Sequence, residues 1–195
     1  MNSILMYNSK VIKALYFAAK AHRNQFRKGN ADIPYLVHPV EVAMILQENN
    51  MSEEIVIAGL LHDTLEDTSV TQEDIEREFG KKILELVLGA SERLEGIEHT
   101  DWKTRKSHTI EYLASAPLDV KYVSCADKLS NIRSMLRDYE EVGEELWKRF
   151  NEKNPLEQKW YYVGLTESLK GLESLKMYVE FKSSVELLFG KYKAN

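Results

Sequence analysis

Apolar positions along the chain recur at helical rather than alternating intervals. Between residues 9 and 25 one helical stripe collects the following small and apolar positions together with one histidine: Val11, Ala14, Leu15, Ala18, Ala19 and His22. Nearly every later segment has the same period. The segments 87–88 and 122–123 have some strand character, but they are too short to make a sheet. The pattern predicts an all-α helical bundle.

Capping and breaking signals divide the chain into individual helices. Pro39 suits the first turn of a helix at about 38–49, and Ser52 suits the cap of the next helix. Thr71, with Asp74 three residues later, predicts the cap of a short helix that ends at residue 80. The remaining periodic segments predict further helices at about 81–91, 103–115, 118–137, 140–151, 155–171 and 173–191, while 27–30 and 92–102 are expected to be polar loops.

Composition narrows the class of protein. With 195 residues, the chain suits one domain, or one domain with an added helical flank. No apolar run approaches the roughly 20 residues of a membrane span, and the one cysteine, Cys125, excludes an intrachain disulfide, so we expect a cytoplasmic protein. The net charge of −5 argues against broad nucleic-acid binding. An anionic substrate remains open if basic residues gather locally.

Ionisable residues follow one of the most apolar stretches of the chain. The run 55–61 leads directly into His62 and Asp63. Burying such groups without partners is costly, and a bound cation would provide a reason for them. His38 upstream and Asp127 downstream complete a set of nitrogen and oxygen donors. This set suits Mn²⁺, Fe²⁺, Zn²⁺, Ni²⁺ or Co²⁺.

The surrounding residues could supply the rest of a phosphate-ester hydrolysis. A metal lowers the pKa of water, and the reaction also needs a base and cations for the developing charge. Glu66 and Asp67 lie four residues beyond the His-Asp pair, and each would share a face with one member if the helix continued. Basic side chains are concentrated at 27–28 and 103–106.

Several local patterns occur in a fixed order along the chain. They are Ala-His-Arg-Asn-Gln followed by Arg-Lys at 21–28, Pro-Tyr-Leu-Val-His-Pro-Val at 34–40, Ala-Gly-Leu-Leu-His-Asp-Thr-Leu-Glu-Asp-Thr at 58–68, Phe-Gly at 79–80 and Ala-Asp-Lys-Leu-Ser-Asn-Ile-Arg at 126–133. Together they resemble the HD-domain metal-dependent phosphohydrolases. Within that family the chain is most similar to the (p)ppGpp hydrolase domain of the stringent-response synthetase/hydrolases and to the small alarmone hydrolases.

The resemblance implies a fold, an activity and site residues. It implies a single HD-domain hydrolase over 1–195, with its core at about 10–140 and a helical flank at about 140–195. One Mn²⁺ would be held by four side chains: His38, His62, Asp63 and Asp127.

The resemblance also assigns residues to the substrate. Glu66 and Asp67 would position and deprotonate the attacking water, while Arg27 and Lys28 match the pair that holds the guanine nucleotide. Asn131 matches the residue that contacts the ribose region. The implied reaction removes pyrophosphate from the 3′ position of ppGpp or pppGpp and leaves GDP or GTP.

Some positions depart from the family pattern and keep other functions open. Relatives usually have a glycine shortly before the Pro-Tyr pair, whereas here Asp32 and Ile33 precede it. Ser130 occupies a position where relatives often have histidine or tyrosine. The alternatives are hydrolysis of another nucleotide or phosphate ester, such as a nucleoside monophosphate, and a non-catalytic metal or nucleotide sensor. His99 and His108, which a second metal would need, lie in a polar region and are expected at the surface.

The last third of the chain has less specific features. Trp160, Tyr161 and Tyr162 are typical of a helix core, although one of them could stack on a purine base. The leucines at 165, 169, 172 and 175 are typical of packing or of a homodimer face.

Overall fold

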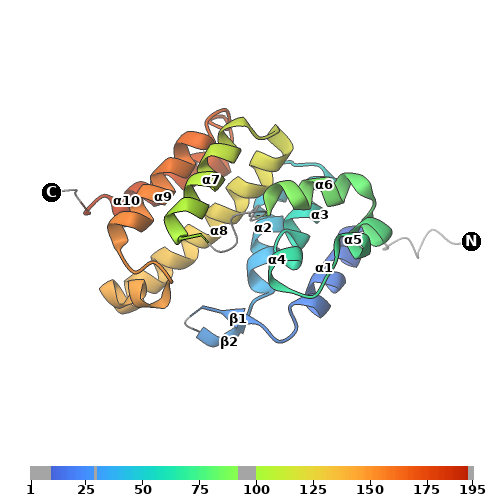
Figure 1. Ribbon diagram of the computed structural model, residues 1–195, viewed down its shortest axis with the longest axis horizontal. Coiled ribbons are helices and arrows are strands. Elements are labelled where there is room, and N and C mark those ends of the chain that lie inside the picture. The colour runs from blue at the N-terminus through green and yellow to red at the C-terminus, as the bar shows by residue number, and fades with distance from the viewer. Residues whose placement is uncertain (1–9, 29, 92–99, 193–195) are drawn as a thin grey trace, which may run out of the picture.

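The structure of the chain is a computed structural model that describes residues 10–28, 30–91 and 100–192. Helices dominate it, and the all-α prediction is confirmed (Figure 1). The elements in chain order are α1 (Lys10–Ala21), β1 (Phe26–Arg27), β2 (Asn30–Pro34), α2 (Val37–Glu48), α3 (Glu53–Leu61), α4 (Thr64–Asp67), α5 (Gln72–Phe79), α6 (Lys81–Ala90), α7 (Trp102–Ser115), α8 (Leu118–Val142), the 3-10 helix η1 (Gly143–Arg149), α9 (Pro155–Ser168) and α10 (Lys176–Phe189).

The long helix α8 organises the bundle. It runs between the N-terminal helices and the C-terminal group formed by α7, α9 and α10 (Figure 1). Helix α8 packs against α2, α3 and α6 on one side and against α10 on another. Its apolar residues, such as Leu129 and Ile132, are buried in the common core. A polar residue at the middle of α8 therefore lies deep inside the molecule.

Close packing between α2 and α3 sets the position of the histidines. All residues of the run 55–61 are buried, as their apolar character predicts. A Cβ atom on Gly59 would lie 2.5 Å from Leu46 Cδ1 and 3.2 Å from Val42 Cγ1, so glycine lets the two helices approach. The start of α2 and the end of α3 are thereby brought together.

The helix boundaries follow the sequence signals closely. Thr71 and Asp74 form the predicted capping box at the start of α5. Gly80, with φ of 90°, makes the turn from α5 into α6. Ser52 occupies the N-cap of α3, but its side chain makes no capping hydrogen bond there. Part of the expected loop at 92–102 lies outside the described residues, and α7 begins at Trp102.

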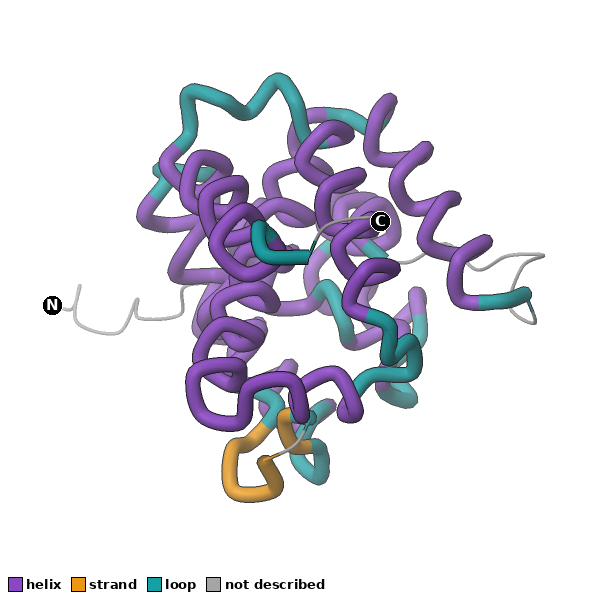
Figure 2. The backbone as a smooth tube through the Cα atoms, turned by 90° about the vertical axis from the view of Figure 1, so that its left-hand side faces the viewer, coloured by secondary structure: helices purple, strands orange, loops and turns teal. Residues whose placement is uncertain are grey.

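Two expectations were wrong in detail. Arg27 and Asn30, expected in a loop at 27–30, belong to the strands of an antiparallel hairpin in which Phe26 pairs with Pro34, whereas Lys28 lies in a turn. This hairpin projects from one end of the bundle (Figure 2). The separate α-helix expected at 140–151 is absent from this described segment. Helix α8 continues to Val142, Gly143 adopts φ of 59°, and η1 follows. Across the described ranges, every helix is too short or too polar to cross a membrane.

Candidate metal centre

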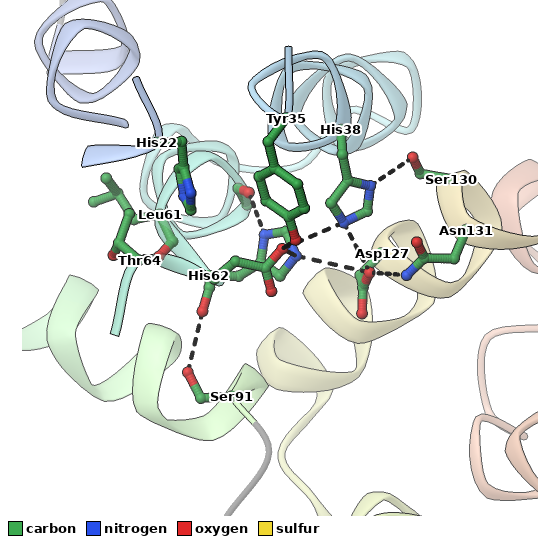
Figure 3. A network of polar contacts seen from close by, with 12 residues as sticks. His22, Tyr35, His38, Leu61, His62, Thr64, Ser91, Asp127, Ser130 and Asn131 are labelled. Atoms are coloured by element: carbon green, nitrogen blue, oxygen red, sulfur yellow. Dashed lines mark hydrogen bonds and ion pairs between the residues drawn. The ribbon is translucent and has the colours of Figure 1, made fainter. Parts of the chain in front are cut away.

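The two predicted histidine ligands lie on neighbouring helices with their rings 5.2 Å apart (Figure 3). His38 belongs to the first turn of α2, and His62 caps the end of α3. Both are buried. The Nδ1 atom of His62 lies 2.8 Å from the Gly59 carbonyl, which can only accept a hydrogen bond. This contact places the proton on Nδ1 and directs the Nε2 lone pair toward the centre.

The two predicted carboxylates complete the cluster from opposite sides. Asp127 lies at the middle of α8, with Oδ1 3.2 Å from His38 Nε2 and 3.7 Å from His62 Nε2. Asp63 follows α3 directly, and its Oδ2 lies 3.0 Å from His62 Nε2 and 3.5 Å from His38 Nε2. The four residues lie up to 89 positions apart in the sequence, and the fold brings them together in one cluster.

The donor atoms suit a divalent cation. Ligand atoms of His38, His62 and Asp127 all lie within 4.8 Å of one another. The buried Nε2 of His62 makes no well-aligned hydrogen bond to a described residue, although the carboxylate oxygen Asp63 Oδ2 lies 3.0 Å from it. A buried nitrogen without such a partner, surrounded by carboxylate oxygens, is what a metal ligand requires. The residues present therefore fit the cation that the resemblance implies.

Electrostatics within the cluster are strongly coupled. Burial alone would lower the pKa of His62, but Asp63 and Asp127 outweigh it and raise that pKa well above its usual value. Burial would raise the pKa of Asp127, whereas Lys128 and the two histidines hold it well below its ordinary range. The carboxylate is therefore ionised and available to a cation at neutral pH.

Two residues around the cluster were not singled out from the sequence. Tyr35 donates a hydrogen bond to Asp63 Oδ2 at 2.5 Å, and burial together with Asp63 raises the pKa of the Tyr35 hydroxyl, so it stays protonated. The Lys128 ammonium lies 2.7 Å from Asp127 Oδ2. Their sequence positions could have indicated that they lie beside the cluster, because Tyr35 lies three residues before His38 and Lys128 directly follows Asp127.

The acidic pair Glu66 and Asp67 lies next to the cluster on the short helix α4. The helix does not continue through the His-Asp pair as the shared-face argument assumed, since α3 ends at Leu61 and α4 begins at Thr64. Glu66 and Asp67 consequently face different spaces. Glu66 lines a hollow of about 110 Å³ together with His62, and Asp67 lines a cleft of about 490 Å³.

The larger cleft contains the predicted substrate contacts. Arg27, Lys28 and Asn131 all line it. Arg27 Nη2 lies 3.4 Å from Asn131 Oδ1, so the hairpin meets α8 at this point. Asn131 also donates to Asp127 Oδ1 at 2.6 Å. The structure therefore brings the three residues to one cleft, and one of them touches the metal cluster directly.

Basic and aromatic residues from the second half of the chain close the cleft. Lys106, Lys128 and Tyr161 line both the cleft and the smaller hollow. The Lys106 ammonium lies 5.1 Å from the centre of the Tyr161 ring. Tyr162 also lines the cleft, while Trp160 packs near Trp102 at 6.4 Å between ring centres.

The other histidines differ in their surroundings. His22 is buried, and its Nδ1 lies 2.6 Å from Gln25 Oε1. His108 is exposed, as expected, and it also lines the smaller hollow. His99 lies outside the described residues.

Comparison with known proteins assigns the family. The HD domain matches residues 14–155 of the chain. The chain belongs to the HD-domain family. A *Xenopus tropicalis* relative, guanosine-3′,5′-bis(diphosphate) 3′-pyrophosphohydrolase MESH1, is 35% identical to this HD-domain chain over 179 residues, covering 88% of the chain and 89% of the relative. The predicted resemblance is confirmed.

Two larger relatives match the same HD-domain chain. The probable GTP diphosphokinase RSH3 of *Arabidopsis thaliana* is 39% identical over 133 residues, which are 66% of the chain and 18% of the relative. A guanosine-3′,5′-bis(diphosphate) 3′-pyrophosphohydrolase of *Borreliella burgdorferi* is 31% identical over 186 residues, covering 94% and 26%. The chain therefore spans at most 26% of the length of these two proteins.

Solved structures share the fold. The crystal structure of lmo0812 from *Listeria monocytogenes* has 35% identity and a TM-score of 0.71, and the match covers 79% of this chain and 99% of that one. The structure of a metazoan ortholog of SpoT that hydrolyzes ppGpp has 24% identity and a TM-score of 0.76, with 94% and 97% covered. The second likeness concerns the fold alone.

Proposed function

We propose that this HD-domain protein is a metal-dependent phosphohydrolase that removes pyrophosphate from the 3′ position of ppGpp or pppGpp. The products are GDP or GTP and pyrophosphate. The observation that carries the proposal is the gathering of His38, His62, Asp63 and Asp127 beside a cleft lined by Arg27. The relative of matching length, which bears the name of a 3′-pyrophosphohydrolase, supports the same substrate.

His38, His62, Asp63 and Asp127 would hold one divalent cation, and we propose Mn²⁺. When bound, the cation supplies positive charge for phosphate oxygens and lowers the pKa of water. The histidine Nε2 atoms and the ionised Asp127 give the mixed nitrogen and oxygen set that Mn²⁺ accepts.

The acidic pair Glu66 and Asp67 would orient the attacking water and accept its proton. Burial and the neighbouring Asp63 raise the pKa of Asp67, which brings this carboxylate closer to the working range of a general base. Water attacks the phosphorus of the 3′ ester, the bond from this phosphorus to the ribose oxygen breaks, and the ribose oxygen gains a proton. Glu66 would orient the same water from the smaller hollow, which it lines together with His62 and Asp63.

The cleft would hold the nucleotide. Arg27 and Lys28 would bind the guanine nucleotide, and Asn131 would contact the ribose region while fixing Asp127. Lys106 and Lys128 line both spaces and would offset phosphate charge between them. The overall charge of −5 is thereby reversed locally, which an anionic substrate needs.

A comparison of substrates at equal concentration tests this proposal. Purified protein with Mn²⁺ would be given ppGpp, pppGpp and a set of nucleoside monophosphates, and the rate of release of each product would be measured. We expect turnover of the 3′-pyrophosphorylated nucleotides and little turnover of the monophosphates. The reverse order would retain the metal centre and reject the substrate. A cytoplasmic location, a homodimer, the lack of nucleic-acid partners and the extent of the single domain over 1–195 remain predictions.

A further inference from the structure

A chain of polar contacts leads away from His38 on the side opposite the metal cluster (Figure 3). His38 Nδ1 lies 2.9 Å from Ser130 Oγ, and Ser130 Oγ lies 2.9 Å from Glu41 Oε2. Arg133 Nη1 lies 3.3 Å from the other oxygen of Glu41. Arg133 also binds Glu180 of α10 through Nε at 2.7 Å and Nη2 at 2.8 Å. The contacts join α2, α8 and α10.

The hydrogen bonds in this chain can be assigned in sequence from donor to acceptor. Glu41 is paired with the Arg133 guanidinium, so it is a carboxylate and can only accept. The Ser130 hydroxyl must therefore give its single proton to Glu41. Ser130 Oγ can then only accept from His38, which places a proton on Nδ1 of that ring. In the neutral ring with this tautomer, the Nε2 lone pair faces the metal cluster.

We propose that Ser130 and Glu41 are positioning residues that hold His38 in the orientation and tautomer required for metal binding. The inference rests on the proposed metal centre, whose cation His38 would ligate. A histidine ligand commonly donates its second ring nitrogen to such a partner. Here the partner is the hydroxyl of Ser130.

Burial makes the Ser130 contact consequential. Ser130 is 1% exposed and His38 is 2% exposed, so water cannot easily replace the hydroxyl. Without Ser130, the His38 ring is free to place its proton on Nε2, which lies 3.2 Å from Asp127 Oδ1. That proton would compete directly with the cation. His62 has no such vulnerability to side-chain substitution, because its Nδ1 is held by a backbone carbonyl.

The contacts of His38, Ser130, Glu41 and Arg133, called the relay below, also connect the metal centre with the C-terminal helix α10. Arg133, on α8, binds Glu180 with two nitrogens, and the same guanidinium also contacts Glu41 on α2. Glu180 lies on α10, beyond the matched HD-domain region 14–155. Helix α10 thereby holds Arg133, which in turn fixes Glu41 in the chain of contacts to His38. Because Glu180 is at the exposed end of the chain of contacts, its removal should weaken metal binding less than removal of Ser130.

Metal affinity measured without substrate tests the relay. Calorimetric titration of the full chain with Mn²⁺ would compare wild type with Ser130→Ala and Glu41→Ala. We expect affinity to fall by about 10- to 100-fold in Ser130→Ala, with a smaller fall in Glu41→Ala. Ser130→Thr, which keeps the hydroxyl, should restore most of the affinity. Matched controls are Ser184→Ala, a buried serine on α10, and Glu48→Ala, an exposed glutamate on α2, and both should bind as wild type does.

A second readout reports the tautomer directly. Long-range proton–nitrogen correlation spectra of the Zn²⁺-loaded protein should show His38 protonated at Nδ1 in wild type and lose that signal pattern in Ser130→Ala. Affinity within twofold of wild type in both Ser130→Ala and Glu41→Ala would overturn the relay while leaving the metal centre intact. Equal loss in Ser130→Ala and Ser130→Thr would assign the effect to packing and would also overturn it. Failure of wild type itself to bind a cation would reject the metal centre instead.

Discussion

Tyr35 donates its hydroxyl proton to Asp63 Oδ2, so a residue just after the hairpin fixes a carboxylate just after α3. We predict that Tyr35→Phe weakens Mn²⁺ affinity by about 10- to 100-fold, because a hydrogen bond to a charged group contributes about 1.5–3 kcal/mol. Calorimetric titration would measure this change.

The control for Tyr35 is a tyrosine whose hydroxyl lies away from the site. Tyr16 on α1 is 67% exposed, and Tyr16→Phe should leave metal affinity unchanged. Unchanged affinity in Tyr35→Phe as well would contradict a supporting role for this hydroxyl.

Asp67 should determine the acid side of the pH–rate profile. A base must be ionised to accept a proton, and the pKa of Asp67 is raised by burial and by Asp63. The rate should therefore fall with decreasing pH at a higher pH than an ordinary aspartate would give. Asp67→Asn should bind Mn²⁺ normally, lose about 10²- to 10⁴-fold in kcat and lose this acid limb. The exposed Glu85→Gln on α6 is the control, and a retained acid limb in Asp67→Asn would assign it to another group.

Glu66 should also be required for turnover, but not for metal binding. Its side chain belongs to the smaller hollow beside His62, where it could orient the attacking water without completing the ligand set. We predict that Glu66→Ala keeps Mn²⁺ stoichiometry and loses most of the kcat. Full activity in this variant would refute the role given to Glu66, whereas loss of metal would move it into the ligand set.

Metal binding should stabilise the folded protein. A ligand that binds only the native state adds about 2.7 kcal/mol at a concentration 100 times its dissociation constant. Addition of Mn²⁺ to chelator-treated protein should therefore raise Tm by several degrees. Asp63→Ala should remove this increase and the activity together, because it deletes an oxygen 3.0 Å from His62 Nε2. A full Mn²⁺-dependent rise in Asp63→Ala would exclude this carboxylate from the centre.

The cysteine should be chemically inert in the folded protein. Cys125 is fully buried on α8, and burial raises the pKa of its thiol to about 12. At pH 8 only about one thiol in 10⁴ would then be ionised, so alkylation should be very slow. Iodoacetamide labelling followed by mass spectrometry should give fast modification only after denaturation. Rapid labelling of the native protein would show that α8 opens locally.

The all-α architecture and the capping box were predictable because they depend on local signals. The helical period, the Thr71–Asp74 spacing and Gly80 each act within a few residues of the chain. The hairpin was missed because β1 and β2 contain only 2 and 5 residues, too few to show alternation. The 3-10 helix η1 was missed because its residues also suit an α-helix, and the positive φ of Gly143 decides between them.

The site was predictable only as a set of residues and not as a geometry. The ordered motifs indicated His38, His62, Asp63 and Asp127 together, and the structure places them at one point. The break between α3 and α4, which turns Glu66 and Asp67 toward different spaces, depends on tertiary packing. The Ser130–Glu41 contact joins residues 89 positions apart, so nothing in the local sequence could reveal it.

The most direct test of the proposed function follows both products and the source of the new oxygen. Protein with Mn²⁺, a metal-free control and the Asp63→Ala variant would be incubated with ppGpp in ¹⁸O-labelled water, quenched with chelator and separated. The proposal predicts GDP and pyrophosphate in equal amounts, with the label in pyrophosphate, and only in the metal-loaded wild type. Metal-independent release, a label in GDP, or no turnover of ppGpp by protein that binds Mn²⁺ would contradict it.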